Sequence, residues 1–296
     1  SKLALSQEVR SLSNFYTSLY SPLICEGVSA NDMASLLSTI RKDHASLATF
    51  RFAPMDPESS GYRILMEAFR TIGLIPFGFF CFGNWYQPVQ EDWPTYLKNR
   101  EGTTRSTIKR MKKKFAADGG TLSLVLGGEN LEKGLAAYEH VYAKSWKVPE
   151  PYPMFVPGLM RTCAENGWLR LGLAWLDGQP IAAQIWIVIN NKANIYKLAY
   201  DENFRSYAPG TLLTAMLMEH AIVQDMVLEV DYLIGDDPYK RSWMSHRRER
   251  WGIIAYNPRT LIGFLGFATE VTFRAFRPAI AQIKTLAIHA RAKLTV

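Results

Sequence analysis

The segment Trp168–Tyr200 reads WLRLGLAWLDGQPIAAQIWIVINNKANIYKLAY, and it decides the fold. It holds three apolar runs separated by two short turns. Asp177-Gly178 is a strong signal for a two-residue hairpin turn, and Asn190-Asn191-Lys192 closes a second hairpin. We therefore expect three consecutive antiparallel strands. They cover residues 168–176, 180–189 and 193–200.

The segments that follow continue as strand, helix and strand. Gly210 to Gln224 has the pattern of a helix, Val227 to Leu233 that of a strand, and Trp251 to Tyr256 that of a last strand. Hairpins combined with a strand–helix–strand unit predict an α/β fold with a mixed sheet flanked by helices.

The first half of the chain also alternates between helices and strands. We expect helices at Ala30–His44 and 60–72 and strands at Leu47–Phe52 and 77–82. Trp93 to Ala117 is expected to form one long helix. Two lobes around one shared sheet and two similar lobes both fit this order.

Composition limits the class of protein. The net charge is +7, and a basic balance suits an anionic ligand, a nucleic acid or an acidic membrane surface. The 3 cysteines lie far apart and have no metal-binding spacing, so we expect neither a disulfide framework nor a metal site. The few cysteines fit a reducing cytoplasm, the first thirty residues hold no signal-peptide pattern, and no apolar run reaches ~18 residues. We therefore expect a cytoplasmic protein, either free or associated with the inner face of the membrane.

A second informative segment runs from Tyr196 through Asp201 and Arg205 to Leu213. Here a strand ends, a loop follows, and Pro209-Gly210 opens a helix. The first-turn amides of a helix have no partners inside it, so a phosphate placed there gains hydrogen bonds and a favourable field. The competing interpretation is that Pro209-Gly210 only begins a helix.

Residues 93–258 resemble the GNAT acyltransferases of the cellulose-biosynthesis-associated and FemAB-like branch. Each matching piece is weak alone, but their order and spacing agree over more than half of the chain. The pieces are Trp93–Arg110, Ser145-Trp146-Lys147, Asp177–Ala183, Tyr196–Asp201, Pro209–Leu213, Asp231–Gly235, Tyr239-Lys240 and Trp243.

The resemblance implies a GNAT fold and an acyl-CoA donor whose pyrophosphate lies at the helix opening after Pro209. Arg205 can stand at the start of the family's loop, while Ala208 replaces the usual middle glycine. The implied cofactor-binding residues are Arg205, Tyr207, Ala208, Pro209, Gly210, Thr211 and Leu212.

We accordingly expect three parts in the chain. Residues 1–92 form an N-terminal α/β lobe, and residues 93–258 form the GNAT-like acyltransferase domain, either as a single such domain or as one of two GNAT-like lobes. Residues 259–296 form a basic amphipathic helix.

Acyl transfer to an amine needs a site for the amine's proton and support for the oxyanion. Asp231 follows an apolar strand and is the first candidate for base or amine anchor; the alternative is a helix cap or an ion pair with Lys240 or Arg241. The resemblance suggests that Tyr239 protonates the leaving thiolate. Lys240 can hold an acidic group or the oxyanion, and a solvated helix start is the alternative for both residues.

Candidate acceptor-binding residues precede the first hairpin. Trp146 and Lys147 are expected to line the acceptor pocket, although a tryptophan is also often a core residue. His140, on a helix with Tyr138 and Tyr142, is the third candidate, with a packed histidine as the alternative.

Two basic segments complete the pattern. Residues 100–114 hold seven basic residues opposed only by Glu101, which indicates either a solvated face or contact with an anionic donor, acceptor or membrane. No nucleic-acid recognition motif accompanies them. In the C-terminal segment, Phe273 and Phe276 begin an apolar face with Ile280, Ile283 and Ala287; such a helix covers a core or makes peripheral membrane contact.

The sequence thus predicts an N-acyltransferase that moves an acyl group from acyl-CoA, or from acyl-carrier protein, to a small-molecule, sugar or lipid amine by direct attack on the thioester. An aminoacyl-tRNA-dependent FemAB-like transferase is one alternative. A non-catalytic GNAT-fold subunit of polysaccharide or lipid assembly is another.

Overall fold

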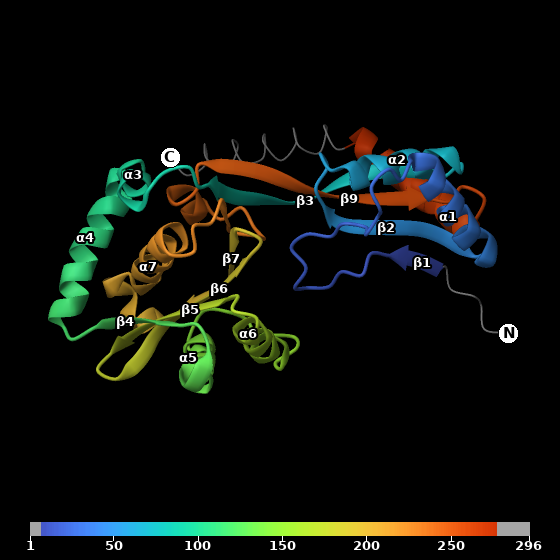
Figure 1. Ribbon diagram of the computed structural model, residues 1–296. Helices are drawn as coiled ribbons and strands as arrows, with labels where there is room; N and C mark the ends of the chain where they lie inside the picture. The colour runs from blue at the N-terminus through green and yellow to red at the C-terminus, as the bar shows by residue number, and fades with distance from the viewer. Residues whose placement is uncertain (1–6, 277–296) are drawn as a thin grey trace, which may run out of the picture. The chain divides into compact units, whose positions relative to one another are not determined.

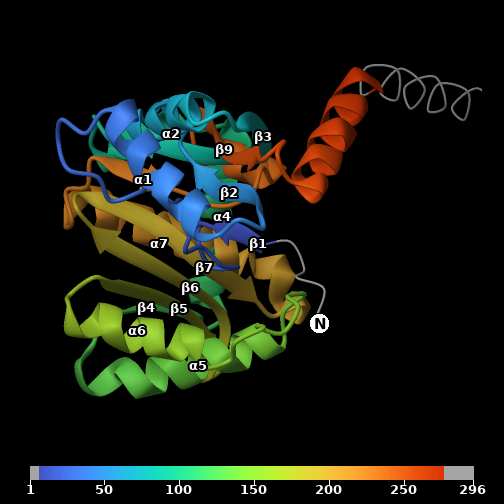
Figure 2. The same ribbon diagram turned by 90° about the vertical axis from the view of Figure 1, so that its right-hand side faces the viewer.

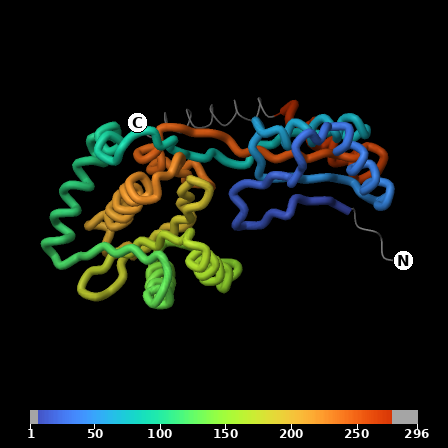
Figure 3. The backbone as a smooth tube through the Cα atoms, in the orientation of Figure 1, coloured from blue at the N-terminus to red at the C-terminus, as the bar shows by residue number. Residues whose placement is uncertain are grey.

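The computed structural model describes residues 7–276 (Figure 1). The chain divides into two compact units, Ser1–Phe82 with Glu249–Val296 and Gly83–Arg248. This division differs from the contiguous parts expected from the sequence, because the end of the chain returns to the unit in which the chain begins. Figure 3 shows the blue first strands and the orange-red last strand gathered in that unit.

In the first unit the strands are ordered β1 (Gln7–Arg10), β2 (Leu47–Met55), β9 (His246–Tyr256) and β3 (Ile75–Pro88). β1 is parallel to β2, and β2 is antiparallel to β9. Helices α1 (Ala30–Asp43) and α2 (Ser60–Thr71) cover these strands through a core that includes Leu37, Phe50 and Phe69. The helices and strands expected between residues 30 and 82 are confirmed, while β1 was not predicted.

In the second unit the order is β3-β8-β7-β6-β5-β4. The new strands are β4 (Thr121–Val125), β5 (Leu169–Leu176), β6 (Gln179–Ile189), β7 (Lys192–Tyr200) and β8 (Glu229–Asp231). Both predicted hairpins are present. Asp177 and Gly178 have φ of 50° and 74°, and Asn190 and Asn191 have 52° and 56°, as a two-residue turn with left-handed backbone requires.

Helices cover both faces of this part of the sheet (Figures 1 and 2). On one face lie α5 (Leu131–Ala143) and α6 (Phe155–Glu165), and on the other α3 (Trp93–Lys98), α4 (Gly102–Ala117) and α7 (Pro209–Val223). α7 packs on β5, β6 and β7 and is covered in turn by α3 and α4. It is apolar nearly all round because it lies between the sheet and these two helices.

The single helix expected over Trp93–Ala117 is wrong, because the helix is interrupted between Lys98 and Gly102 and the segment forms two helices, α3 and α4. Arg100 lies in this break and is buried, donating to the Trp243 carbonyl at 3.0 Å and to Ser245 Oγ at 2.8 Å. Its guanidinium also covers the Tyr96 ring at 4.6 Å. Arg100 is therefore part of the interior and not of the exposed basic face of α4.

β8 is shorter than predicted, and this shortness shapes the site. Its 3 residues pair with Lys192–Asn194, whereas β7 continues to Tyr200. After β8 the Tyr232 amide donates to the Trp85 carbonyl at 2.9 Å, and Leu233 takes φ of 56°. The chain thus follows β3 and leaves β7, so the carboxyl half of β7 extends beyond its ladder with β8.

The C-terminal segment is helical over the described residues 261–276, where Leu261, Phe273 and Phe276 are exposed. The predicted positions Ile280, Ile283 and Ala287 lie outside the described residues. Within residues 7–276, no helix combines the length and apolarity that crossing a bilayer requires.

Candidate active site

The start of α7 is an uncapped helix opening. Ala208 has left-handed backbone, with φ of 50° and ψ of 46°, and its amide donates to the Arg205 carbonyl at 3.0 Å. Pro209 has no amide hydrogen, and the Leu212 amide already donates to the Ala208 carbonyl at 3.1 Å. No side chain of the described residues caps this end, so the amides of Gly210 and Thr211 are available to a ligand.

A buried amide side chain fixes this opening to the sheet. Gln184 of β6 is 1% exposed, and its Nε2 donates to the Gly210 carbonyl at 2.9 Å and to Thr214 Oγ1 at 2.8 Å. Trp186 Nε1 in turn donates to Gln184 Oε1 at 3.0 Å. Gln184 was not among the residues predicted from the sequence. Its signal was a lone amide in an apolar strand, and buried polar groups must be paired.

Most of the predicted cofactor-binding residues gather at this opening, in two roles. Arg205 is exposed there, and Gly210 and Thr211 offer their amides. Tyr207 lies beneath Lys114 of α4, with Nζ 4.6 Å from its ring centre, and its hydroxyl donates to Asp118 Oδ2 at 2.9 Å. Leu212, by contrast, is 2% exposed and packs in the core, so it supports the opening from inside.

The end of β7 connects the opening to the predicted acceptor residues. A Cβ on Gly210 would lie 3.7 Å from Tyr200 Cδ1, and the Tyr200 ring centre is 4.7 Å from that of Trp146. Trp146 is 46% exposed, so the alternative that it belongs to the core is wrong. Lys147 follows, with Nζ 5.2 Å from the Trp146 ring centre.

Lys147 lies in a group of charged side chains. Burial lowers the pKa of Lys147 most, the cations of Lys197 and Lys240 lower it further, and Asp237 and Glu150 oppose them. Lys197 Nζ pairs with Glu150 Oε1 at 2.6 Å. The fold thus brings residues 145–150, the end of β7 and the loop after β8 together.

Lys240, in η3 (Pro238–Ser242), holds that loop in place. It is 3% exposed, and its Nζ donates to the carbonyls of Ile234 at 2.6 Å and Gly235 at 3.2 Å and pairs with Asp237 Oδ2 at 3.0 Å. Gly235 has φ of 102°, and a Cβ there would lie 3.1 Å from Lys240 Nζ. These contacts favour a positioning role for Lys240.

Tyr239 has the properties of a proton donor. It is 46% exposed, and its ring meets Tyr232 edge-on at 5.8 Å. Burial of the hydroxyl, together with the nearby Asp237 carboxylate, raises the pKa of Tyr239. The phenol is therefore protonated at neutral pH, as a group that protonates a leaving thiolate must be.

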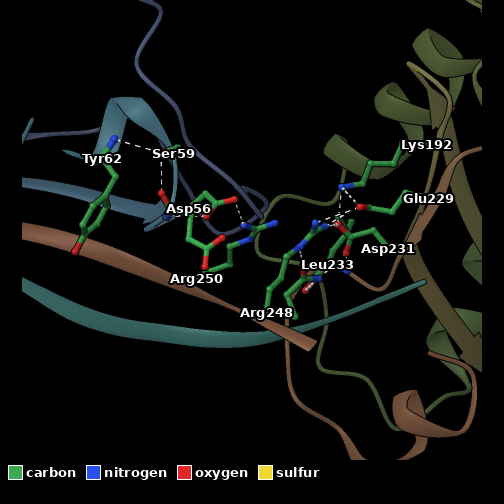
Figure 4. A network of polar contacts seen from close by, with 11 residues as sticks. Asp56, Ser59, Tyr62, Lys192, Glu229, Asp231, Leu233, Arg248 and Arg250 are labelled. Carbon is green, nitrogen blue, oxygen red and sulfur yellow. Dashed lines mark hydrogen bonds and ion pairs between the residues drawn. The ribbon is translucent and has the colours of Figure 1, made fainter. Parts of the chain in front are cut away.

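Both carboxylate oxygens of Asp231 have hydrogen-bond or ion-pair partners (Figure 4). Asp231 is 2% exposed, accepts from Asn84 Nδ2 at 2.5 Å and the Leu233 amide at 2.6 Å, and pairs with Lys192 Nζ and Arg248 Nη2, each at 2.6 Å. The prediction that Asp231 pairs with Lys240 or Arg241 is wrong, because Lys192 and Arg248 take that place. Burial raises the pKa of Asp231, but Lys192, Asn84 and Arg248 outweigh it and the pKa is lowered. These contacts favour the alternative that Asp231 forms structural ion pairs over the prediction that it acts as the catalytic base.

His140 and the basic helix complete the placement of the predicted residues. His140 is exposed on α5 and is not among the residues that line the pocket beside it. The cations of α4 are exposed, and within residues 7–276 we find no ion pair to them. They are Arg105, Lys109, Arg110, Lys112, Lys113 and Lys114.

A comparison with protein families matches residues 102–241 to the acetyltransferase (GNAT) domain. The chain carries a GNAT acetyltransferase domain. The matched range contains the α7 opening, residues 145–150 and the loop through Lys240, so the GNAT domain holds all the predicted site residues. The domain makes the protein an N-acyltransferase of the GNAT type, with an acyl donor and an amine acceptor.

Solved structures share the fold at low identity. FemX aligns with a TM-score of 0.57 at 11% identity over 80% of this chain and 78% of its own. The C-terminal domain of a protein described as a lysylphosphatidylglycerol synthetase, from Agrobacterium fabrum, aligns with a TM-score of 0.54 at 13% identity over 86% and 81%. Among the curated proteins no match is found.

We predict that Asp231→Asn destabilises the fold by about 3 kcal/mol, because it removes the buried carboxylate that pairs with the partly buried cations Lys192 and Arg248. The lowered pKa values of Asp231 and Glu229 mean that their stabilisation is complete above their unfolded-state pKa values and is lost as the pH falls through the folded ones. As the pH is lowered, the free energy of unfolding should therefore fall less steeply for Asp231→Asn than for the wild type. Urea unfolding between pH 7 and pH 3 measures both effects.

Asp236→Asn is the matched control for that experiment. Asp236 also pairs with an arginine, Arg247 at 2.7 Å, but its side chain is 44% exposed. Exposed pairs contribute little, so the control should stay close to wild type. Equal losses in the two variants would contradict the assigned importance of the buried cluster.

Proposed function

We propose that the donor is acyl-CoA and that its phosphates bind at the opening of α7. The observation that carries this proposal is the pair of uncapped amides of Gly210 and Thr211 at the start of α7, which lies beside the end of β7. Arg205 is exposed in the loop that leads to this start. An anion at a helix start gains these donors and the positive end of the helix dipole. The fold likeness to acyl-transferring domains supports the same use of the opening.

The amide-containing arm of the donor would extend from the phosphates along the carboxyl half of β7. This half of the strand runs past the end of its ladder with β8, so an arm that carries amides can add to it as a further strand would. A backbone amide of β7 is then placed to support the thioester oxygen as it becomes negative. The thioester would lie near Tyr200 and Trp146.

In the reaction, the nitrogen of a neutral amine attacks the thioester carbon and the oxygen takes up negative charge. When the carbon–sulfur bond breaks, Tyr239 gives its proton to the leaving thiolate. Asp237, 57% exposed and close enough to Lys147 to affect its pKa, takes the amine's proton through water. The net change is one amide and one thiol formed from one thioester and one amine.

We predict that Gly210→Trp abolishes donor binding, because the indole would cover the opening of α7. For the wild type, CoA at 100 times its dissociation constant should stabilise the protein by about 2.7 kcal/mol. Thermal unfolding with and without CoA measures the difference. Gly158→Trp, exposed on α6 with no atom within 4 Å of the added Cβ, is the control and should keep the CoA response.

Gly210→Ala tests whether the larger substitution acts by blocking. The nearest atom to its Cβ is at ordinary contact distance, so this variant should fold and still bind CoA. Unchanged CoA stabilisation in Gly210→Trp would refute the proposed donor position.

We predict that Tyr239→Phe lowers kcat by ~10²–10⁴-fold with a nearly unchanged KM for the donor, since the phenol acts only as the thiolate leaves. Because the pKa of Tyr239 is raised, the wild-type kcat should fall only at a pH above the ordinary range of tyrosine. Steady-state rates from pH 6 to 11 test both statements. Tyr152→Phe, at a 61% exposed position, is the control, and an equal kcat for wild type and Tyr239→Phe would rule out the role.

An aminoacyl-tRNA donor is the second candidate, and the exposed cations of α4 favour it. FemX and the lysylphosphatidylglycerol synthetase domain share the fold, and the resemblance to the FemAB-like branch implies such a donor. An acidic acyl-carrier protein would suit the same surface. Binding to a polyanion through several cations weakens steeply with salt, whereas binding of CoA at one helix opening does not.

We predict that changing Lys109, Lys112 and Lys113 together to Gln leaves the KM for acyl-CoA within about twofold of wild type. These side chains are exposed, and salt screens the electrostatic interaction of exposed charges with a distant ligand. The same change at Lys42, Lys133 and Lys144 is the control for lost charge. If tRNA or carrier protein is the donor, the α4 variant alone should raise the KM for that donor, and the effect should fade at high salt. Binding of CoA without turnover of any amine would favour the non-catalytic alternative.

A further inference from the structure

A pocket of about 370 Å³ lies between α5, α6 and the segment that joins them. Its walls are mainly apolar and aromatic, with Tyr138 and Tyr142 from α5 and Val156 and Pro157 from α6. Its volume is at the small end of the range for small-molecule sites. Three charged residues also line it: Glu139, Lys147 and Glu150.

The charges around Lys147 do not balance. Lys197 is paired with Glu150 at 2.6 Å and Lys240 with Asp237 at 3.0 Å, so the two nearby carboxylates already have cations. Among the described residues, no carboxylate lies within ion-pair distance of Lys147 Nζ. Lys147 is exposed along its side chain, yet partial burial of its ammonium and the cations of Lys197 and Lys240 lower its pKa, and an anionic group bound at Lys147 would relieve this cost.

We propose that this pocket binds the acceptor, and that the acceptor is a free α-amino acid with a large apolar side chain. The side chain fills the space between α5 and α6, and the carboxylate binds the Lys147 ammonium. The amine then points toward the end of β7, because Lys147 covers Trp146 and Trp146 contacts Tyr200. This inference rests on the proposed function, since it names the acceptor of that same reaction.

Other reactants fit the pocket less well. An acyl tail would fill the apolar walls but would leave the Lys147 cation without an anion. An amino sugar carries hydroxyl groups all round its ring, and those that face the apolar part of the walls, Pro149, Pro153, Val156 and Pro157, would be left without hydrogen-bond partners. The product of the proposed reaction is an N-acyl amino acid: the nitrogen of the neutral amine forms the amide bond, the thioester carbon–sulfur bond breaks, and the proton that the amine loses is balanced by the proton that the thiol gains.

The first experiment compares amines at a fixed acyl-CoA concentration. The amines are phenylalanine, leucine, glycine and phenethylamine, which has the body of phenylalanine without its carboxylate. Phenylalanine should exceed glycine in kcat/KM by more than about 100-fold, as several methylene-sized groups in an apolar pocket allow. It should exceed phenethylamine by at least about 10-fold, as a charge-assisted contact allows.

Lys147→Met and Lys147→Arg test the carboxylate contact. In Lys147→Met the ratio of kcat/KM for phenylalanine over phenethylamine should fall toward one, while phenethylamine itself changes little. Lys147→Arg should keep most of the ratio, since it keeps the cation. A ratio that stays at the wild-type value in Lys147→Met would overturn the assignment of Lys147, whatever the overall rate.

Ala143→Trp tests the pocket itself. Ala143 is exposed at the end of α5 and lines the pocket, whereas the adjacent Lys144 is exposed and does not. Ala143→Trp should raise the KM for phenylalanine by at least about 10-fold and leave glycine unchanged, and Lys144→Trp should do neither. Equal effects on both amines, or none, would overturn the pocket assignment.

Direct binding separates this inference from the proposed function. Calorimetry of phenylalanine titrated into protein saturated with CoA should show binding in wild type and weaker binding in Lys147→Met. If CoA binds but neither phenylalanine nor leucine does, the acceptor assignment is wrong and the donor site stands. If CoA does not bind but phenylalanine binds in a Lys147-dependent way, the pocket stands and the donor proposal fails.

Discussion

The site depends on a cluster of four charged side chains, one buried and three partly buried, that joins strands β7, β8 and β9. Lys192 of β7 and Arg248 of β9 are each paired with both Glu229 and Asp231 of β8, at 2.6 to 2.9 Å. Burying charges is costly, so such a cluster adds little net stability over apolar residues, yet the loss of one member is expensive. What it supplies here is position: β8 is fixed in register beside the start of β7 and cannot follow it further.

Because β8 ends at Asp231, the chain turns away at Leu233 while β7 continues. The free half of β7 and the start of α7 then lie at the same end of the sheet. Gln184 ties the first turn of α7 to β6 from within the core. The first turn of α7 is thus held to the sheet by a buried amide whose donor and acceptor are both paired.

The polar residues of the candidate site fall into two kinds. Asp231 and Lys240 are nearly fully buried and saturated with contacts, and they hold the backbone in place. Tyr239, Asp237 and Lys147 are exposed, so their hydroxyl, carboxylate and ammonium groups can be reached from outside. A reactive group must be reachable and free to change its partners, and a group that positions the chain must not be.

The sequence alone determined the local parts of this protein: the two hairpins through their Asp-Gly and Asn-Asn turns, the helix opening at Pro209-Gly210, and the ordered motifs that predict a GNAT domain. These depend on residues close together in the chain. Only the tertiary structure decided which cations meet Asp231, that Arg100 is buried, that Trp146 is exposed and that Lys147, which borders a pocket, has no ion-pair partner among residues 7–276. Those outcomes depend on pairings between residues far apart, where burial sets the strength of each charge, and no local pattern encodes them.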